Sequence, residues 1–389
     1  MLTTGRDIVA GVLLAGLLAS LAYSVACLVR LLTFRRSPAP PGTFTPKVTV
    51  LKPVCGSDPT LLGCLRSLFT QDYPDYQVVF GVRDPNDAAL PVIRQVLAEF
   101  PDRDATLIVD GRVYGGNRKM SNMTNVTPAI KHDILVIADA DSLVEPRYLR
   151  AVVAPFEDPK VGAATVFYVG KGMGGLWSVL GASFINDWFL PSVLVGLLLE
   201  PPSYCFGATM VARREALEAI GGFRALTTYL ADDYLLGHLI KKKGWEVRFA
   251  ATVVTTAVYE RSLVTLLRHE LRWGRTFRTV RPIGWTGTIL TDTTILALLY
   301  LLASGGSTLG LSLLAASLLL RSAVVLAVRR RFPIEEPPRL WLVPFRDLLC
   351  FAVRLVSFVG RQVRWKSEDF LIQSAGHLEP KEGDAVSSS

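Results

Sequence analysis

The chain has 389 residues, of which 50% are hydrophobic, and its mean hydropathy is +0.35. This composition is high for a soluble protein, so we expect membrane segments beside one or two folded domains. The net charge of +8 is not gathered into a basic face with interleaved aromatic residues, which argues against a nucleic-acid-binding protein. Five scattered cysteines and four histidines argue against a disulfide framework and a zinc site.

The N-terminal segment 8–29 carries no charge and is long enough to span a bilayer. A cleaved signal peptide would carry its basic residues mainly before the apolar run, whereas here three arginines follow it between positions 30 and 36. We therefore expect an uncleaved anchor over 1–36, with the following domain in the cytosol by the positive-inside rule. Residues 37–46 are predicted to be a linker.

A soluble α/β pattern extends over 47–282. Short apolar strands alternate with helices, which predicts a mainly parallel sheet covered by helices on both faces. No G-x-G-x-x-G motif follows the first strand and no Walker A motif is present, which argues against a dinucleotide dehydrogenase. The strands are expected at 48–51, 77–82, 106–109, 134–138, 204–211 and 254–258, and the helices at 58–68, 87–100, 214–220, from 232 onward and at 263–277.

The central strand, 134–138, ends in two carboxylates, Asp139 and Asp141. In open α/β sheets, ligands bind where the carboxyl ends of strands meet loops. Two acids in D-x-D spacing at such a place need a partner, and a hard divalent cation (Mg²⁺ or Mn²⁺) that also binds phosphate oxygens is the natural one. A solvated turn at the strand end is the alternative, because D-x-D also occurs by chance.

The segment 172–200 is apolar and aromatic, but Asn186, Asp187 and Pro191 interrupt it. Interrupted apolar and aromatic stretches of this kind are typical of the membrane interface. A pair of ordinary core helices would show the same composition. Both interpretations of this segment remain open from the sequence alone.

The C-terminal third returns to membrane-like composition, with two predicted spans in 283–331. An uncharged turn separates them and the triple arginine 329–331 follows them, which places the turn outside and the arginines inside. In the region 332–378, polar residues recur every seven positions, as Asp347, Arg354 and Arg361. Such a stripe predicts an interfacial helix rather than a span. The polar tail 379–389 is predicted to be disordered.

Four features follow one another along the chain: Asp84 at a strand end, the D-x-D pair, Asp233 after a Gly-Gly loop, and Arg272-Trp273 on a basic helix. Their order and spacing resemble the D, D, D, (Q/R)xxRW signature of processive-type family 2 and ceramide-glucosyltransferase-type family 21 glycosyltransferases. His269 stands at the first position of the last motif, which departs from the pattern. Further stretches that resemble family 21 are 48–53, 71–74, 83–87, 116–122 and 231–234, while 184–191 and 269–273 look most like its bacterial ceramide and hopanoid-biosynthesis subgroup.

The resemblance implies a GT-A fold, a Rossmann-like nucleotide-diphospho-sugar transferase domain on the cytosolic side of a bacterial inner membrane. It also implies that Asp84 contacts the uridine of the donor and that Lys119 lies near the donor. A cation held by Asp139 and Asp141 would neutralise the charge that develops on the leaving diphosphate. Arg272 would add a second positive clamp on the phosphates.

Two further residues receive roles on chemical grounds. Trp273 offers an aromatic face for a sugar or base, and an anchor at the membrane interface is its alternative. Asp233 is the candidate general base, which would deprotonate the acceptor hydroxyl so that it attacks the anomeric carbon with inversion. The neighbouring Asp232 is expected to be a helix cap.

The leading hypothesis is therefore a membrane-bound, metal-dependent transferase that moves a hexose from a UDP-sugar to a lipid hydroxyl, of ceramide or a hopanoid. A processive polysaccharide synthase is the alternative enzyme, but it needs a secretion channel, for which the predicted spans are too few. A non-catalytic nucleotide-sugar-binding or transport protein is the alternative of another class. It would keep the donor site without needing Asp233, and transport is disfavoured because the spans show no internal repeat.

Overall fold

The computed structural model describes residues 5–35, 44–365, 368–373 and 376–380. Residues 37–43 of the predicted linker and 381–389 of the predicted tail lie outside this range. The chain divides into two compact units. The sheet unit comprises Arg36–Tyr168, Glu200–Tyr259 and Gln362–Ser389, and the helical unit comprises Met1–Arg35, Val169–Leu199 and Glu260–Arg361.

Within the described residues of the sheet unit, the main sheet has the strand order β3-β2-β1-β4-β7-β6-β8-β5. The strands β3, β2, β1 and β4 are parallel, whereas the β4–β7, β6–β7 and β5–β8 pairs are antiparallel. The predicted α/β fold is thus confirmed, with an antiparallel half that the sequence pattern did not show. The bounds are β1 (Val48–Pro53), β2 (Tyr76–Val82), β3 (Ala105–Val109), β4 (Ile134–Ala138), β5 (Ser142–Leu143), β6 (Val161–Gly172), β7 (Thr209–Arg213) and β8 (Glu246–Val258).

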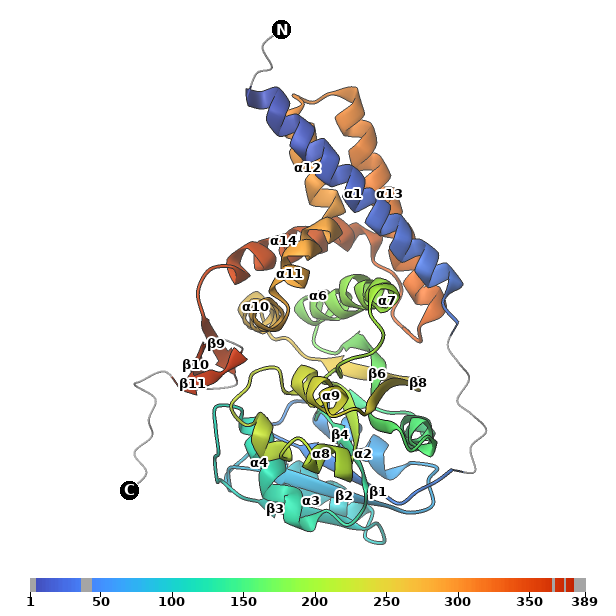
Figure 1. Ribbon diagram of the computed structural model, residues 1–389, viewed down its shortest axis with the longest axis vertical. Helices are drawn as coiled ribbons and strands as arrows, with labels where there is room; N and C mark the ends of the chain where they lie inside the picture. Colours follow the sequence, from blue (N-terminus) through green and yellow to red (C-terminus); the bar gives the residue numbers. More distant parts are fainter. Residues whose placement is uncertain (1–4, 36–43, 366–367, 374–375, 381–389) are drawn as a thin grey trace. The chain divides into compact units, whose positions relative to one another are not determined.

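Helices cover both faces of the sheet, as expected for strands that are apolar along their whole length (Figure 1). Successive side chains alternate between the faces, so Val50 packs into one core and Leu51 into the other. The first core includes α2 (Leu61–Phe69), α3 (Ala89–Glu99) and α5 (Tyr148–Val153), and the second includes α4 (Arg118–Val126), α8 (Arg214–Glu218) and α9 (Asp232–Lys242).

The sheet unit also contains a small antiparallel sheet near the C-terminus, which the sequence did not predict. It consists of β9 (Gln362–Trp365), β10 (Glu368–Ile372) and β11 (Leu378–Pro380), in the order β11-β10-β9. The residues 379 and 380, expected in the tail, lie in β11. This sheet packs on Leu230, which precedes α9.

Among the described residues of the helical unit, three helices are long and apolar enough to cross a membrane: α1 (Gly5–Thr33), the helix over Leu176–Leu199, and α13 (Thr308–Arg331). These lengths are consistent with an integral membrane protein. The helices α1, α12 (Thr293–Ala303) and α13 pack side by side (Figure 1).

The predicted span at 285–304 is a bent pair of segments, Pro282–Thr291 and Thr293–Ala303, which meet at 64°. The break falls at Asp292, whose backbone is not helical and whose carboxylate accepts a hydrogen bond from Arg354 Nε at 2.8 Å. The buried acid therefore interrupts an otherwise apolar segment.

The helix α14 (Val343–Ser357) carries two residues of the predicted polar stripe, Asp347 and Arg354, and both face the protein. The third, Arg361, follows the helix and is exposed. Arg346, Asp347 and Arg354 are all 2% exposed, whereas Phe345 and Leu348 on the same helix are 63% and 53% exposed. The outward face is therefore apolar.

The aromatic segment 172–200 forms α6 (Leu176–Ser183), a π-helical segment (Phe184–Phe189) and α7 (Leu190–Leu199). Trp188 is buried, and its indole N–H donates to Thr291 Oγ1 at 2.8 Å. Asn186 pairs with both backbone groups of Gly170, at 2.8 and 2.9 Å. The aromatic half of the segment is therefore part of the core of the helical unit, whereas Leu199 at its end is 85% exposed.

Candidate functional site

The parallel half of the sheet reverses its strand order between β1 and β4, and the predicted D-x-D pair follows β4 at this point. Such a switch point is where open α/β sheets form a ligand-binding crevice. Lys52, near the end of β1, is fully buried there and its ammonium donates to the main-chain oxygen of Asp139. Burial lowers the pKa of Lys52. A lysine inside an otherwise apolar strand is the sequence signal that could have found this residue.

Lys119 lies between two carboxylates, as the resemblance implied for a residue near the donor. Its Nζ is 2.7 Å from Asp139 Oδ1 and 3.5 Å from Asp232 Oδ2. Burial alone would lower the pKa of Lys119, but the charges of Asp139 and Asp232 outweigh it and raise the pKa. Lys119 is therefore a fixed positive charge beside the D-x-D motif.

Asn117 caps the helix that carries Lys119. Its side-chain oxygen accepts a hydrogen bond from the backbone of Met120 at 2.9 Å, while its amide donates to Asp232 Oδ1 at 3.1 Å. The start of α4 is thereby tied to the start of α9. Ala231 occupies the N-cap position of α9, so the prediction that Asp232 caps this helix is wrong. The Asp232 carboxylate is instead engaged by Asn117 and Lys119.

Asp141 carries a buried oxygen, Oδ1, that has no hydrogen-bond partner among the described residues. Burial, together with the negative charge of Asp139, raises the pKa of Asp141 to about 6. An unpaired, desolvated carboxylate oxygen beside a second acid suits a hard divalent cation. No cluster of three or more His, Cys, Asp or Glu ligands exists in the described part of the chain. The protein would thus supply one or two carboxylates, as in magnesium sites that are completed by substrate phosphates and water.

Asp233 faces the same place as Asp139. A methyl group built on Gly207 would lie 3.2 Å from Asp233 Oδ2 and 3.7 Å from Asp139 Oδ2, so both carboxylates converge on this glycine. Burial, followed by the charge of Asp232, raises the pKa of Asp233 to about 6. A base with a pKa close to neutral is suited to proton abstraction. Gly207 keeps the space between the two acids open, a role that the sequence alone did not reveal.

Asp84 follows β2, which lies beside β1 in parallel register. Its carboxylate is on the same edge of the sheet as the D-x-D pair, and it accepts a hydrogen bond from the backbone of Asn86 at 2.8 Å. The structure therefore brings Asp139, Asp141 and Asp233 together and places Asp84 two strands from β4.

The (Q/R)xxRW-like motif lies on α10 (Leu263–Val280) of the helical unit, which begins with a capping box formed by Ser262 and Thr265. His269 Nδ1 lies 2.9 Å from Glu260 Oε1, and its ring lies 4.2 Å from that of Trp273. Burial lowers the pKa of His269, and the nearby Arg272 adds to this, although Glu260 opposes it.

A second aromatic ring also contacts Trp273. Phe184 stacks on the Trp273 ring with a centroid distance of 5.4 Å. His269 and Phe184 thus hold the indole in place, and Trp273 lies within the aromatic packing of the helical unit. The geometry favours a fixed orientation for the helix turn that carries Arg272.

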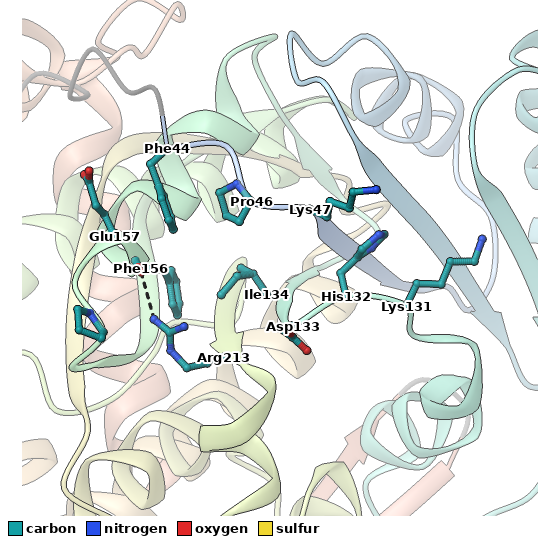
Figure 2. A pocket seen from close by; sticks show the side chains of 11 residues that line it. Phe44, Pro46, Lys47, Lys131, His132, Asp133, Ile134, Phe156, Glu157 and Arg213 are labelled. Atoms are coloured by element: carbon teal, nitrogen blue, oxygen red, sulfur yellow. Dashed lines mark hydrogen bonds between the residues drawn. The ribbon is translucent and has the colours of Figure 1, made fainter.

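A cavity of about 520 Å³ lies at the opposite edge of the sheet, at the amino ends of β1 and β4 (Figure 2). Lys131, His132 and Asp133 line it, and Arg213 donates to the backbone oxygen of Phe156 beside it at 3.1 Å. Its described lining contains none of the acids predicted for the site. This cavity therefore does not coincide with the candidate site.

Comparison with known proteins gives one family. The model described as Glycosyl transferase family 21 matches residues 12–378. Among curated proteins, Ceramide glucosyltransferase 1 of Caenorhabditis elegans is 26% identical over 277 residues, which cover 69% of this chain and 59% of that protein. An N-acetylglucosaminyltransferase of Bradyrhizobium diazoefficiens is 26% identical over 249 residues, covering 60% of this chain and 49% of that protein. The chain spans about half the length of the curated relatives it matches.

Among solved structures, a mannosyltransferase from Pyrobaculum calidifontis in complex with GDP-Man and Mn²⁺ superposes with a TM-score of 0.54 and 23% identity. The match covers 91% of this chain and 99% of that one. At this identity the likeness concerns the fold, and it agrees with the GT-A fold expected from the sequence.

Proposed function

Because the chain belongs to glycosyl transferase family 21, we propose that it transfers a hexose from a UDP-sugar to the hydroxyl group of a membrane lipid, with inversion. The observation that carries this proposal is the convergence of Asp233 and Asp139 on Gly207, beside the unpaired oxygen of Asp141. One acid is free to act as a base while its neighbours are suited to the donor.

In this proposal the Asp233 carboxylate takes the proton from the acceptor hydroxyl as its oxygen attacks the anomeric carbon. The bond between that carbon and the diphosphate breaks on the opposite face, and the proton remains on Asp233 until product release. Lys119 is already fixed at 2.7 Å from Asp139, where its charge would stabilise the departing diphosphate. Arg272 would contribute a second positive charge.

The proposed cofactor is a divalent cation, Mg²⁺ or Mn²⁺, held by Asp139 and Asp141. When bound, it would supply Lewis-acid stabilisation of the leaving diphosphate. The unpaired Asp141 Oδ1 supports this assignment, because a buried carboxylate oxygen without a donor is costly unless a ligand completes it. Asp84 is proposed to contact the uridine, and Trp273 to offer its face to the sugar or base.

The proposed acceptor is ceramide or a hopanoid at the inner leaflet of a bacterial inner membrane, with the catalytic domain 47–282 in the cytosol. Three membrane-compatible helices and the apolar outward face of α14 support a lipid acceptor. Ile283, just after α10, is a further apolar side chain that is 89% exposed. The names of the relatives, ceramide glucosyltransferase and N-acetylglucosaminyltransferase, make glucose and N-acetylglucosamine the sugars to test first.

The test uses the purified full chain with UDP-glucose or UDP-N-acetylglucosamine and a total lipid extract, with products identified by mass spectrometry. We expect a singly glycosylated lipid, which Asp233→Asn should nearly abolish. Long polysaccharide in place of glycolipid would favour a processive synthase instead. UDP-sugar binding without any product would favour a non-catalytic binding protein.

The membrane orientation has a separate test. A reporter inserted at Gly305 should lie outside the cytosol and one fused after Arg331 should lie inside, because the arginines follow the last predicted span. The reverse result would contradict a cytosolic donor site.

A further inference from the structure

The C-terminal sheet β9–β11 contacts three separate segments of the sheet unit, and each segment immediately precedes a residue of the candidate site. Arg83 comes before Asp84, Arg118 comes before Lys119, and the turn 228–230 leads into the acids of α9. No sequence motif connected residues 362–380 with these segments. The contacts are of two kinds, an ionic one and a backbone one.

The ionic contact is made by Glu368 in β10. Its carboxylate accepts a hydrogen bond from Arg118 Nε at 2.7 Å, and it lies 3.6 Å from the guanidinium of Arg83. Arg118 also lies over the ring of Phe370, two residues further along the same strand, at 5.7 Å. One carboxylate therefore bridges two arginines, Arg83 in the loop after β2 and Arg118 at the start of α4. Without it, the two like charges would repel each other and their loops would separate.

The backbone contact is made by the turn and strand 376–378. The Leu378 N–H donates to Thr228 O at 2.7 Å, and Gly376 O accepts a hydrogen bond from the backbone of Leu230 at 3.0 Å. The side chain of Leu230 is buried among residues of the small sheet, namely Val363, Phe370, Ile372 and Leu378. The segment just before Asp232 and Asp233 is therefore held both by backbone hydrogen bonds and by the burial of the Leu230 side chain.

The strand β11 also lies in close contact with the loop before α4. A methyl group on Gly116 would lie 2.6 Å from Leu378 Cβ, so only glycine permits this approach. The next residue, Asn117, donates its backbone N–H to Thr227 O at 2.7 Å. Leu378 is thus wedged between the loop that starts α4 and the turn that starts α9.

We propose that the C-terminal sheet is a positioning element of the donor site, in which Glu368 fixes the arginines beside Asp84 and Lys119. This inference rests on the proposed function, because it takes those two residues to bind the donor. Glu368 itself is a positioning residue: it contacts Arg83 and Arg118 rather than the sugar nucleotide. The sheet would set the spacing between the uridine end and the diphosphate end of the site.

The experiment compares Glu368→Gln with Asp369→Asn in the full chain. Asp369 is the neighbouring acid of the same strand, and its nearest described cation is Arg364, at 4.0 Å, within the small sheet. It therefore controls for loss of a carboxylate from β10. UDP affinity is measured by calorimetry, and kcat and KM are measured for the UDP-sugar.

We expect Glu368→Gln to weaken UDP binding and to raise the donor KM by about tenfold, the loss expected for one charge-assisted contact, with a smaller change in kcat. Asp369→Asn should leave all three quantities near those of the wild type. Equal UDP affinity for the wild type and Glu368→Gln would overturn the inference. A wild type that binds no UDP would instead overturn the proposed donor, so the two failures are distinguishable.

A charge exchange covers the case in which Glu368→Gln folds poorly. Glu368→Arg alone should lose UDP affinity, and Glu368→Arg combined with Arg118→Glu should recover part of it, because the ion pair is restored in the opposite sense. An equal loss in the single and the double variant would show that the ion pair does not position the site, and would also overturn the inference.

Discussion

Buried carboxylates occur in both units, but their hydrogen-bond and ion-pair partners differ. In the helical unit, Glu270 binds Arg346 through two hydrogen bonds of 2.6 and 2.7 Å, and Asp347 binds Arg321 at 2.8 Å. Glu260 pairs with His269 rather than with an arginine. In the sheet unit, Asp141 keeps a buried oxygen without a partner among the described residues. Matched pairs hold helices together, whereas an unmatched acid leaves capacity for a ligand.

The electrostatics of the two groups follow from this difference. An arginine is permanently charged and presents a planar fork, so it fixes the geometry of a carboxylate and keeps it ionised. Asp141 and Asp233 lack such a partner, and burial together with a neighbouring acid raises the pKa of each to about 6. The comparison therefore separates acids that stabilise the fold from acids suited to bind or react.

The largest expected effect concerns Asp233. Asp233→Asn keeps the shape of the side chain but removes its basicity, so turnover should fall by a factor of about 10² to 10⁴. UDP affinity should stay close to that of the wild type, because the proposed donor contacts are other residues. Steady-state rates and UDP titrations measure both quantities.

Asp232→Asn is the matched control for Asp233→Asn. Asp232 holds Asn117 and Lys119, so its loss should act mainly on stability and on donor affinity. If Asp232→Asn stopped turnover and Asp233→Asn did not, Asp232 rather than Asp233 would be the general base. Near wild-type rates for both variants would show that neither acid acts as a general base.

The second effect tests the other side of the comparison. Arg346→Met leaves Glu270 buried and unpaired, which should lower the free energy of unfolding by about 3–5 kcal/mol. Both side chains are at most 2% exposed, so solvent cannot compensate. Arg346→Met combined with Glu270→Leu should recover most of the loss, and unfolding followed in detergent micelles would show whether it does.

A third expected effect concerns the stability cost of the unpaired Asp141 carboxylate. Asp141→Asn removes a buried charge that has no partner. The raised pKa of Asp141 means that its ionised form destabilises the folded protein, so the free energy of unfolding falls as pH rises through about 6. Without divalent cation at pH 7.5, the variant should therefore be more stable than the wild type by about 1–2 kcal/mol. It should also lose the thermal stabilisation that Mn²⁺ gives the wild type. A Mn²⁺-induced shift that survives in Asp141→Asn would contradict the metal assignment.

Local sequence patterns predicted the elements that are defined by nearby residues. The strand β4 has the bounds expected from its apolar run, because charged residues flank it on both sides. The strand β6 was missed, because its partner β7 lies far along the chain and the pairing is antiparallel. The strands β9–β11 are short and rich in polar residues, and their burial depends on Leu230. Such tertiary dependence leaves no periodic signal.

The residues of the candidate site also differ in whether nearby sequence predicts their role. The acids could be predicted because each follows a strand or opens a helix, a relation visible along the chain. Lys52, Asn117 and Gly207 could not be assigned roles, since each acts on a residue many positions away. The polar stripe of α14 was recognised, but its direction was not: only the ion pairs show that it faces the protein.

The smallest expected effect is the pH dependence of turnover, and it distinguishes the two unmatched acids from each other. A general base must be deprotonated, so kcat should decline as pH falls through the pKa of Asp233, which is about 6. The rate should be about half of its plateau at pH 6 and about a tenth at pH 5. Asp141 has a similarly raised pKa, but saturating Mn²⁺ would stabilise its ionised form and remove it from the profile. The profile is therefore measured with saturating Mn²⁺ and donor, so that the acid limb of kcat reports the base. A limb that moves with Mn²⁺ concentration would assign it to Asp141 instead, and a rate that stays flat from pH 8 to pH 5 would show that the reacting hydroxyl does not depend on a carboxylate of this pKa.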